Sequence, residues 1–230
     1  MTLSLARRAT AEFLGCAFLA LVIIGSGLAA QQLSPGATGL ELLENALATG
    51  AGLMAVIFMV IGVSGAHLNP VVSITDASLG RIGWREVGAY VPSQVLGCVV
   101  GAVVANVMFS HAAISISTKH RASGAHFLSE IIATAGLLVL IFALVRSERR
   151  GVIPFAVGAY IAGAYFFTSS TSFANPAVTV GRMFSNSFAG IAPSSAPFFI
   201  GAQLLAVPIA LAVIHLLYPL GERVPEQEPA

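Results

Sequence analysis

The feature that most constrains this sequence is a set of long apolar runs joined by short polar connections. Six runs are each long enough to cross a bilayer as a helix, which takes roughly 20 mostly apolar residues. They cover about residues 9–30, 42–64, 87–109, 127–145, 152–169 and 197–217. Only 9% of the 230 residues are charged, whereas a soluble domain usually carries about 25%. Since so few charges cannot cover a water-exposed surface, the sequence predicts an all-α membrane protein with six transmembrane helices.

Two further apolar segments, about residues 69–79 and 175–184, are too short to span a membrane. At about ten residues, each makes roughly 15 Å of helix, or half of a bilayer. One begins with Asn69-Pro70 and the other with Asn175-Pro176. Asn is a favoured N-cap and Pro is favoured at the first helical position. The two segments are therefore predicted to be half-helices that start at these Asn-Pro pairs.

The two halves of the chain carry matching polar residues in the same order. Each has a Glu near the start of its first helix, an Asn-Pro pair and a Gln in its last helix. The corresponding pairs are Glu12 and Glu130, Asn69 and Asn175, and Gln94 and Gln203. Because three crossings per half is an odd number, the second half enters from the opposite face, which predicts an inverted repeat. The repeats cover about residues 1–115 and 116–221 of a single channel domain (1–230), and residues 222–230 are expected to be a disordered tail.

The distribution of basic residues predicts the orientation of the chain. One side of the predicted membrane holds eight of them: Arg7, Arg8, Arg81, Arg85, Arg146, Arg149, Arg150 and Arg223. The other side holds Lys119, Arg121 and Arg182. The positive-inside rule then places both termini in the cytoplasm, in an inner (plasma) membrane, with the loop 110–125 outside. A formal net charge of +1 argues against nucleic acid or a polyanion as a partner.

An inverted repeat with two half-helices predicts a pore. The helix starts meet near the middle of the membrane, where irregular backbone is tolerated only if it is buried or lines a wet cavity. If each Asn caps its own helix with its side-chain oxygen, its amide donors are left for a passing hydroxyl group. Each helix start also carries roughly half a positive charge, which repels cations. The pattern therefore favours passive passage of small uncharged solutes.

Two other classes of function, a coupled transporter and an enzyme, compete with a pore. Intramembrane carboxylates such as Glu12 and Glu130 usually indicate function, so a proton-coupled transporter is the alternative that they raise. An enzyme is not supported, because no acid pair, nucleophile or metal-ligand spacing surrounds His67. No cofactor or metal is expected.

Each Asn-Pro pair begins a three-residue box. The first box is Asn69-Pro70-Val71, within residues 64–71 (Ser-Gly-Ala-His-Leu-Asn-Pro-Val), and the second is Asn175-Pro176-Ala177. These boxes resemble those of the aquaporin and aquaglyceroporin family, with Val71 in place of the usual Ala. The resemblance implies six helices and two half-helices, one pore per subunit and a homotetramer in the lipid bilayer. It also implies that the two Glu residues accept N–H groups of the loops before the half-helices. The other buried polar residues with such a structural role are His67, Gln94 and Gln203.

The family narrows its pore at a filter of four positions, which fall by gap-free counting on Thr49, Gly163, Ser172 and Val178. Water-selective relatives use an aromatic residue, His, a small residue and Arg, whereas glycerol channels keep the aromatic residue and Arg but have Gly at the second position. This chain has neither the aromatic residue nor the Arg there, which implies a wider filter without a fixed cation. Arg182 lies one helical turn beyond Val178. It is expected either to supply a displaced charge at the pore mouth or to lie among lipid headgroups.

Residues 171–193, with Val178 after the second box, are most similar to bacterial members associated with arsenic resistance, the AqpS type. That similarity implies passage of water, glycerol-like polyols and neutral arsenicals such as arsenous acid, a small neutral triol. A water-selective aquaporin is the alternative within the family.

Overall fold

The computed structural model describes residues 3–219, which form eight α-helices and one short 3-10 turn. Six of the helices are long and apolar enough to span a membrane, which confirms the predicted fold class. The helices are α1 (Leu5–Leu33), α2 (Thr38–Ser64), α3 (Pro70–Ser78), α4 (Trp84–Met108), α5 (Gly124–Arg146), α6 (Ile153–Phe167), α7 (Pro176–Arg182) and α8 (Ala196–Leu217). The turn η1 (Arg150–Val152) leads into α6. The predicted tail, residues 222–230, lies outside the described residues.

Five of the six spanning helices begin before the apolar runs that predicted them, whereas α6 is shorter than its run, 152–169. Helix α1 begins at Leu5, where the Ser4 hydroxyl accepts a hydrogen bond from the backbone N–H of Arg7 (3.3 Å). At 29 residues the helix is roughly 43 Å long, whereas the hydrocarbon core of a bilayer is about 30 Å thick. Hydropathy therefore locates the part of a helix that lies in lipid, and the cap determines where the helix begins.

Glycines let two neighbouring helices approach closely. A Cβ at Gly97 of α4 would collide with the carbonyl oxygen of Phe13, and one at Gly101 with that of Ala17, both in α1. Lipid tails are as apolar as Leu, so helices in membranes associate through close packing of small residues. The Gly-x-x-x-Gly pair of α4 is thus used inside the chain. Helices α5 and α8, which correspond to α1 and α4 in the repeat, also pack together.

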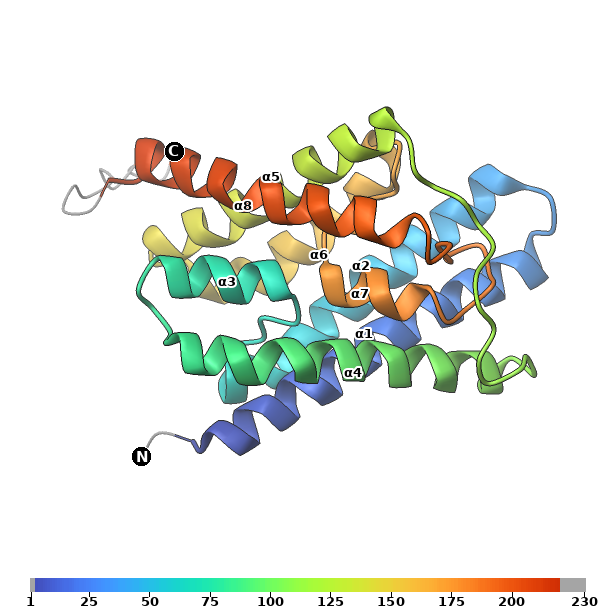
Figure 1. The fold of residues 1–230 in the computed structure, drawn as a ribbon, viewed down its shortest axis with the longest axis horizontal. Helices are drawn as coiled ribbons and strands as arrows, with labels where there is room; N and C mark the ends of the chain where they lie inside the picture. Colours follow the sequence, from blue (N-terminus) through green and yellow to red (C-terminus); the bar gives the residue numbers. More distant parts are fainter. Residues whose placement is uncertain (1–2, 220–230) are drawn as a thin grey trace, which may run out of the picture.

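The half-helices α3 and α7 lie end to end between the long helices, with their N-termini together (Figure 1). Asn69 caps α3 by accepting from the N–H of Val71 (3.1 Å). Asn175 caps α7 by accepting from the N–H groups of Ala177 (2.9 Å) and Val178 (3.2 Å). Each helix has Pro at its first position. The local sequence thus sets both helix starts.

The two ends of the helix bundle carry different segments. The end with the first residues of α1 and the last residues of α8 is here called the terminal face (Figure 1). The end with residues 34–37, 109–123 and 183–195 is called the loop face. Helix α3 runs toward the terminal face and α7 toward the loop face (Figure 1).

Candidate functional site

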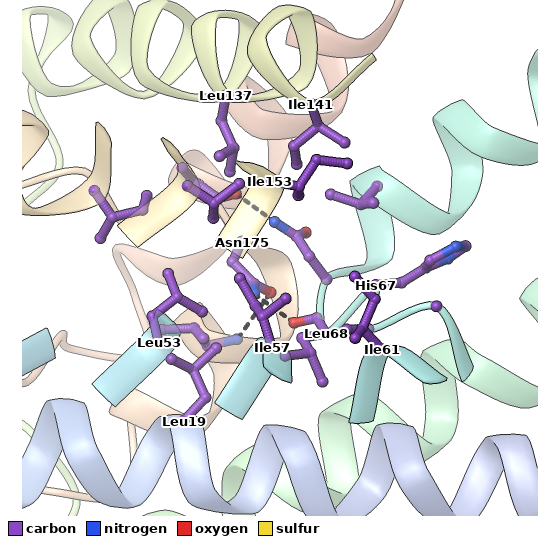
Figure 2. Close-up of a pocket in the computed structure, with 18 of the residues that line it drawn as sticks. Leu19, Leu53, Ile57, Ile61, His67, Leu68, Leu137, Ile141, Ile153 and Asn175 are labelled. Carbon is purple, nitrogen blue, oxygen red and sulfur yellow. Dashed lines mark hydrogen bonds between the residues drawn. The ribbon is translucent and has the colours of Figure 1, made fainter. Parts of the chain in front are cut away.

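A cavity of about 360 Å³ passes the point where the two half-helices meet. Arg81 and Arg150 line it at the terminal face, and Tyr165 and Arg182 line it at the loop face. Apolar side chains spaced at helical intervals line it from both sides of Asn175: Leu53, Ile57 and Ile61 on α2, and Leu137 and Ile141 on α5 (Figure 2). Residues 64–69 and 172–175, which lead into the half-helices, add backbone and polar side chains to the lining. The cavity therefore has both apolar and polar groups along its length.

Asn69 and Asn175 join the two half-helices at the middle of the cavity. The side-chain amide of Asn69 donates to the carbonyl oxygen of Ala174 (2.8 Å), and that of Asn175 donates to the carbonyl oxygen of Leu68 (2.8 Å; Figure 2). Sequence reasoning missed this exchange and left both amide hydrogens of each Asn to the lumen. Because a side-chain amide has two N–H donors, one on each Asn remains. Both residues line the cavity.

Glu12 holds the loop before α3. Its carboxylate accepts from the backbone N–H groups of His67 (3.0 Å) and Leu68 (2.6 Å) and from the side-chain amide of Gln94 (2.7 Å). The Ser64 hydroxyl donates to it as well. A trans peptide directs its N–H and C=O to opposite sides, so the carbonyls of Ala66 and His67 point away from Glu12. Since residues 65–68 line the cavity, these carbonyls supply acceptors in its lining.

Glu130 holds the loop before α7 in the same way. Its carboxylate accepts from the N–H groups of Phe173 and Ala174 (both 2.9 Å) and from the side-chain amide of Gln203 (2.6 Å). Both loops contain non-glycine residues with positive φ, among them Ala66 (52°), Leu68 (53°), Ser172 (49°) and Ala174 (47°). Such backbone is costly and persists only where the surroundings fix it. Here the buried carboxylates provide that fixation.

Three of the four predicted filter residues, Thr49, Ser172 and Val178, line the loop-face part of the cavity. Gly163 does not, and the prediction was wrong at this position: it lies exposed on α6, and a Cβ there would meet no atom within 4 Å. The side chains of α6 that line the cavity are Ile161 and Tyr165, one turn apart. A residue midway between them points to the opposite side, because two residues turn a helix by about 200°.

Tyr165 brings an aromatic ring to the loop-face end of the cavity, although none of the four counted positions is aromatic. Its side chain is 2% exposed, and its hydroxyl donates to the Thr49 hydroxyl (3.2 Å). Gap-free counting from the second box missed it because α6 is followed by a loop whose length sets the count. The last helical hydrogen bond of α6 runs from the Thr168 N–H to the Ala164 carbonyl (3.2 Å), and the loop to the second box begins after it.

Arg182 is buried and lines the cavity, so placing it among lipid headgroups was wrong. Its guanidinium lies 3.4 Å from the centre of the Phe173 ring, and its Nε donates to the carbonyl oxygen of Ala189. A fixed cation therefore does exist at the loop-face end, one turn beyond Val178. This fits the other expectation for Arg182, a charge displaced by one turn from the counted filter positions, which themselves carry no cation.

Comparison with known proteins agrees with this architecture. The sequence pattern of the Major intrinsic protein family matches residues 1–173. The chain belongs to this family. It is 42% identical over 226 residues to "Aquaglyceroporin AqpS" of Rhizobium meliloti (strain 1021), covering 98% of this chain and 96% of that protein. It is 31% identical over 163 residues to "Probable glycerol uptake facilitator protein" of Thermotoga maritima, covering 64% and 69%.

Among solved structures, that of the aquaglyceroporin from Plasmodium falciparum has the same fold. It superposes with a TM-score of 0.69 at 23% identity, over 95% of this chain and all of that chain. Major intrinsic proteins are channels for small solutes rather than enzymes, so the chain is a multi-pass membrane protein of a channel family. Residues 3–219 also contain no group of three or more His, Cys, Asp or Glu side chains placed to hold a metal ion.

The terminal-face end of this major intrinsic protein contains residues that sequence reasoning left out. Asp76 of α3 contacts both the Nε of Arg81 (2.7 Å) and the Nε2 of His67 (3.3 Å). The Nδ1 of His67 lies 3.0 Å from the Ser73 hydroxyl. His67, Asp76 and Arg81 all line the cavity. Overlaying the two Asn-Pro boxes is the signal that would have found Asp76, because it lies as far beyond Asn69 as Arg182 lies beyond Asn175.

Proposed function

We propose that this chain is a passive channel for water, glycerol-like polyols, and arsenous acid and related neutral arsenicals. The observation that carries the proposal is a cavity with apolar and polar lining that passes both Asn residues. A small polyol has a carbon face and a hydroxyl face. The apolar side chains of α2 and α5 suit its carbon face. Its hydroxyl groups meet the remaining amide donors of Asn69 and Asn175 and the backbone carbonyls of the two loops. The two helix starts oppose cations at the same point.

Selection by size and polarity is assigned to the loop-face end. Thr49, Ser172 and Val178 are joined there by Tyr165 and Arg182. Since Val178 occupies the position where relatives of this family carry Arg, and the guanidinium of Arg182 is held one turn farther out, the proposed filter has room for solutes larger than water. Tyr165 and Arg182 also give the water-selective alternative a specific basis, because an aromatic ring and a cation narrow a pore.

A proton-coupled transporter is not favoured by the contacts of Glu12 and Glu130. Neither carboxylate lines the cavity. Each instead accepts from two loop N–H groups and a Gln side chain, which suits a fixed anion that holds the loop. Protonation of such a carboxylate would break the bonds accepted by one of its oxygens and weaken those accepted by the other.

The channel is proposed to act as a homotetramer in the inner (plasma) membrane with both termini in the cytoplasm. The support for the orientation is the arginine-rich terminal face, where Arg81, Arg85, Arg146, Arg149 and Arg150 lie at helix ends or in short connections. The support for the assembly is the resemblance to the family. Its neutral solutes and the lipid bilayer are the partners that the proposal requires.

The decisive experiment measures solute entry into proteoliposomes by stopped-flow light scattering, with no proton gradient. Glycerol and arsenous acid are expected to enter faster than into empty liposomes and to stop at equal concentrations inside and outside. Asn175→Asp is the matched loss variant, because it removes the amide donor to Leu68 and adds negative charge where two helix starts meet. It is expected to lower solute flux and admit cations. Entry of water alone would support the water-selective alternative. Solute accumulation driven by a proton gradient would overturn the proposal of a passive channel.

A further inference from the structure

Asp76 is the only carboxylate that lines the cavity among residues 3–219. It lies on α3 near the terminal face and is 7% exposed. One of its oxygens accepts from the Nε of Arg81 (2.7 Å), and the other lies 3.3 Å from the Nε2 of His67. A buried carboxylate that faces a solute path is costly unless it is paired. Arg81 offsets its charge, so the site is not a simple trap for cations.

The inverted repeat places Asp76 and Arg182 at equivalent positions. Each is the seventh residue after the Asn that caps its half-helix, and each lines one end of the cavity. Each also contacts the residue two positions before that Asn: Asp76 contacts His67, and Arg182 lies over the Phe173 ring. The same place in the repeat thus carries a hydrogen-bond donor at one mouth and an acceptor at the other.

The carboxylate of Asp76 has hydrogen-bonding capacity left. An ionised carboxylate offers about four lone-pair sites, and the contacts with Arg81 and His67 occupy two of them. Residues 3–219 of the chain provide no further partner for the Asp76 carboxylate. Its remaining lone pairs can therefore accept only from molecules in the cavity. Neutral solutes with several hydroxyl groups are the donors that fit such a site. Arg81 and His67 also fix the orientation of the carboxylate, so little ordering is needed when a solute arrives.

We propose that Asp76 forms a second selectivity site, separate from the loop-face filter. At the terminal-face mouth it accepts O–H hydrogen bonds from polyhydroxylated neutral solutes. This inference rests on the proposed channel function and names the solute class for which the cavity is built. A solute then meets an anchored donor, Arg182, at one end, the Asn donors in the middle and an anchored acceptor, Asp76, at the other. Water is small enough to pass without the carboxylate, whereas a triol must exchange several hydrogen bonds with water for bonds to the wall.

The test measures glycerol and water permeability of the full chain in proteoliposomes for wild type and Asp76→Asn. Asn keeps the size of the side chain but replaces one acceptor by a donor and removes the charge. Hydrogen bonds to charged groups are the strong ones, so glycerol permeability is expected to fall about fivefold or more while water permeability stays within about twofold. Asp76→Ser removes the carboxylate in a smaller side chain and gives the same readout if the first variant does not fold.

Glu86→Gln is the matched control, because Glu86 is the other ion-paired carboxylate at the terminal face. It pairs with Arg8 (3.0 Å) and does not line the cavity. Its glycerol-to-water ratio is expected to equal that of wild type. An unchanged ratio in the Asp76 variants, or an equal loss of water and glycerol flux, would overturn the inference and make Asp76 a purely structural residue. If wild type itself passes no glycerol, the proposed function fails instead, so the two failures are distinguishable.

Discussion

The two halves of the molecule have nearly identical interiors and very different mouths. In the first half, the Gln94 amide donates to Glu12 (2.7 Å) and to the Ser73 hydroxyl (3.1 Å), which donates to the carbonyl of Asn69 (3.3 Å). This chain of bonds ties a spanning helix, a half-helix and a loop together. It leaves the Asn side chain free to cap the helix and to reach its counterpart in the other half.

The second half repeats this network with one conservative change. The Gln203 amide donates to Glu130 (2.6 Å) and to the Thr179 hydroxyl (3.0 Å), which donates to the carbonyl of Asn175 (2.8 Å). Thr179 therefore replaces Ser73 with the same bonds. Such agreement between halves shows what the fold demands: a buried carboxylate and a Gln wherever a half-helix begins inside the membrane.

The mouths differ because the charges there are paired in different ways. All three ion pairs among residues 3–219, Arg8–Glu86, His67–Asp76 and Arg81–Asp76, lie at the terminal face. At the loop face the basic side chains are satisfied by backbone carbonyls and aromatic rings instead: Lys119, Arg121 and Arg182.

The largest expected effect comes from the residues that the halves share. Glu12→Gln and Glu130→Gln each remove a buried charge that accepts several hydrogen bonds, and bonds to charged groups contribute about 1.5–3 kcal/mol each. Both variants should give less folded protein and melt at least about 5 °C lower in detergent. The Glu12 variant should be the less stable of the two, because Glu12 accepts from four donors and Glu130 from three.

The control for these variants is Glu86→Gln, whose carboxylate has a single side-chain partner at the surface. Its melting temperature should stay close to that of wild type. A Glu12→Gln protein that melts like wild type and has lost only proton-coupled uptake would contradict the structural role and revive the transporter alternative.

A smaller effect is expected at the proposed loop-face filter, where the halves differ. Tyr165→Leu removes the hydroxyl that contacts Thr49 and shortens a side chain that lines the cavity. Glycerol permeability should rise a few-fold, and that of a four-carbon polyol by more, because the constraint is mainly steric. Gly163→Leu is the matched control on the same helix. Since a Cβ there meets no atom within 4 Å and the position is exposed, away from the cavity, solute flux per folded channel should not change.

The two positions on α6 also test the filter assignment against the count made from the sequence. A block of glycerol flux by Gly163→Leu, together with no effect of Tyr165→Leu, would show that the gap-free count was right and that α6 is rotated. Stopped-flow measurements of both variants, normalised to the amount of reconstituted protein, decide between the two.

The sequence alone predicted the scaffold well, because each part of it follows from a local rule. Run lengths located the six spans, and Asn-Pro located both half-helix starts, since capping depends on neighbouring residues. The side chains that line the cavity on α6 could not be predicted in this way. A shift of two residues turns a side chain by about 200°, which separates Tyr165 from Gly163. The contact of Asp76 with His67 was also missed, because it depends on how a half-helix folds back beside its loop.

The smallest expected effect concerns the charges at the loop face. Burial lowers the pKa of Lys119 from 10.5 to about 8, with further contributions from the nearby cations Arg121 and Arg182. Its ammonium donates to the carbonyl of Phe188 (3.0 Å). Because the folded chain binds this proton more weakly than the unfolded chain, the folded state gains stability as the pH rises from about 8 toward 10.5. The terminal face carries arginines and no lysine.

Lys119 is the only lysine in the chain, so its protonation can be followed by chemical labelling. An amine-reactive reagent modifies the neutral amine, and the extent of labelling at this residue, read by mass spectrometry, should reach half its maximum near pH 8. Lys119→Arg supplies the blank, which separates Lys119 from the N-terminal amine. Arg121→Gln should move the midpoint upward, because it removes the like charge that lowers the pKa of Lys119 most. A wild-type midpoint near 10.5 would contradict the burial of the Lys119 ammonium among the loop-face cations, and the contrast between the two mouths would then no longer hold.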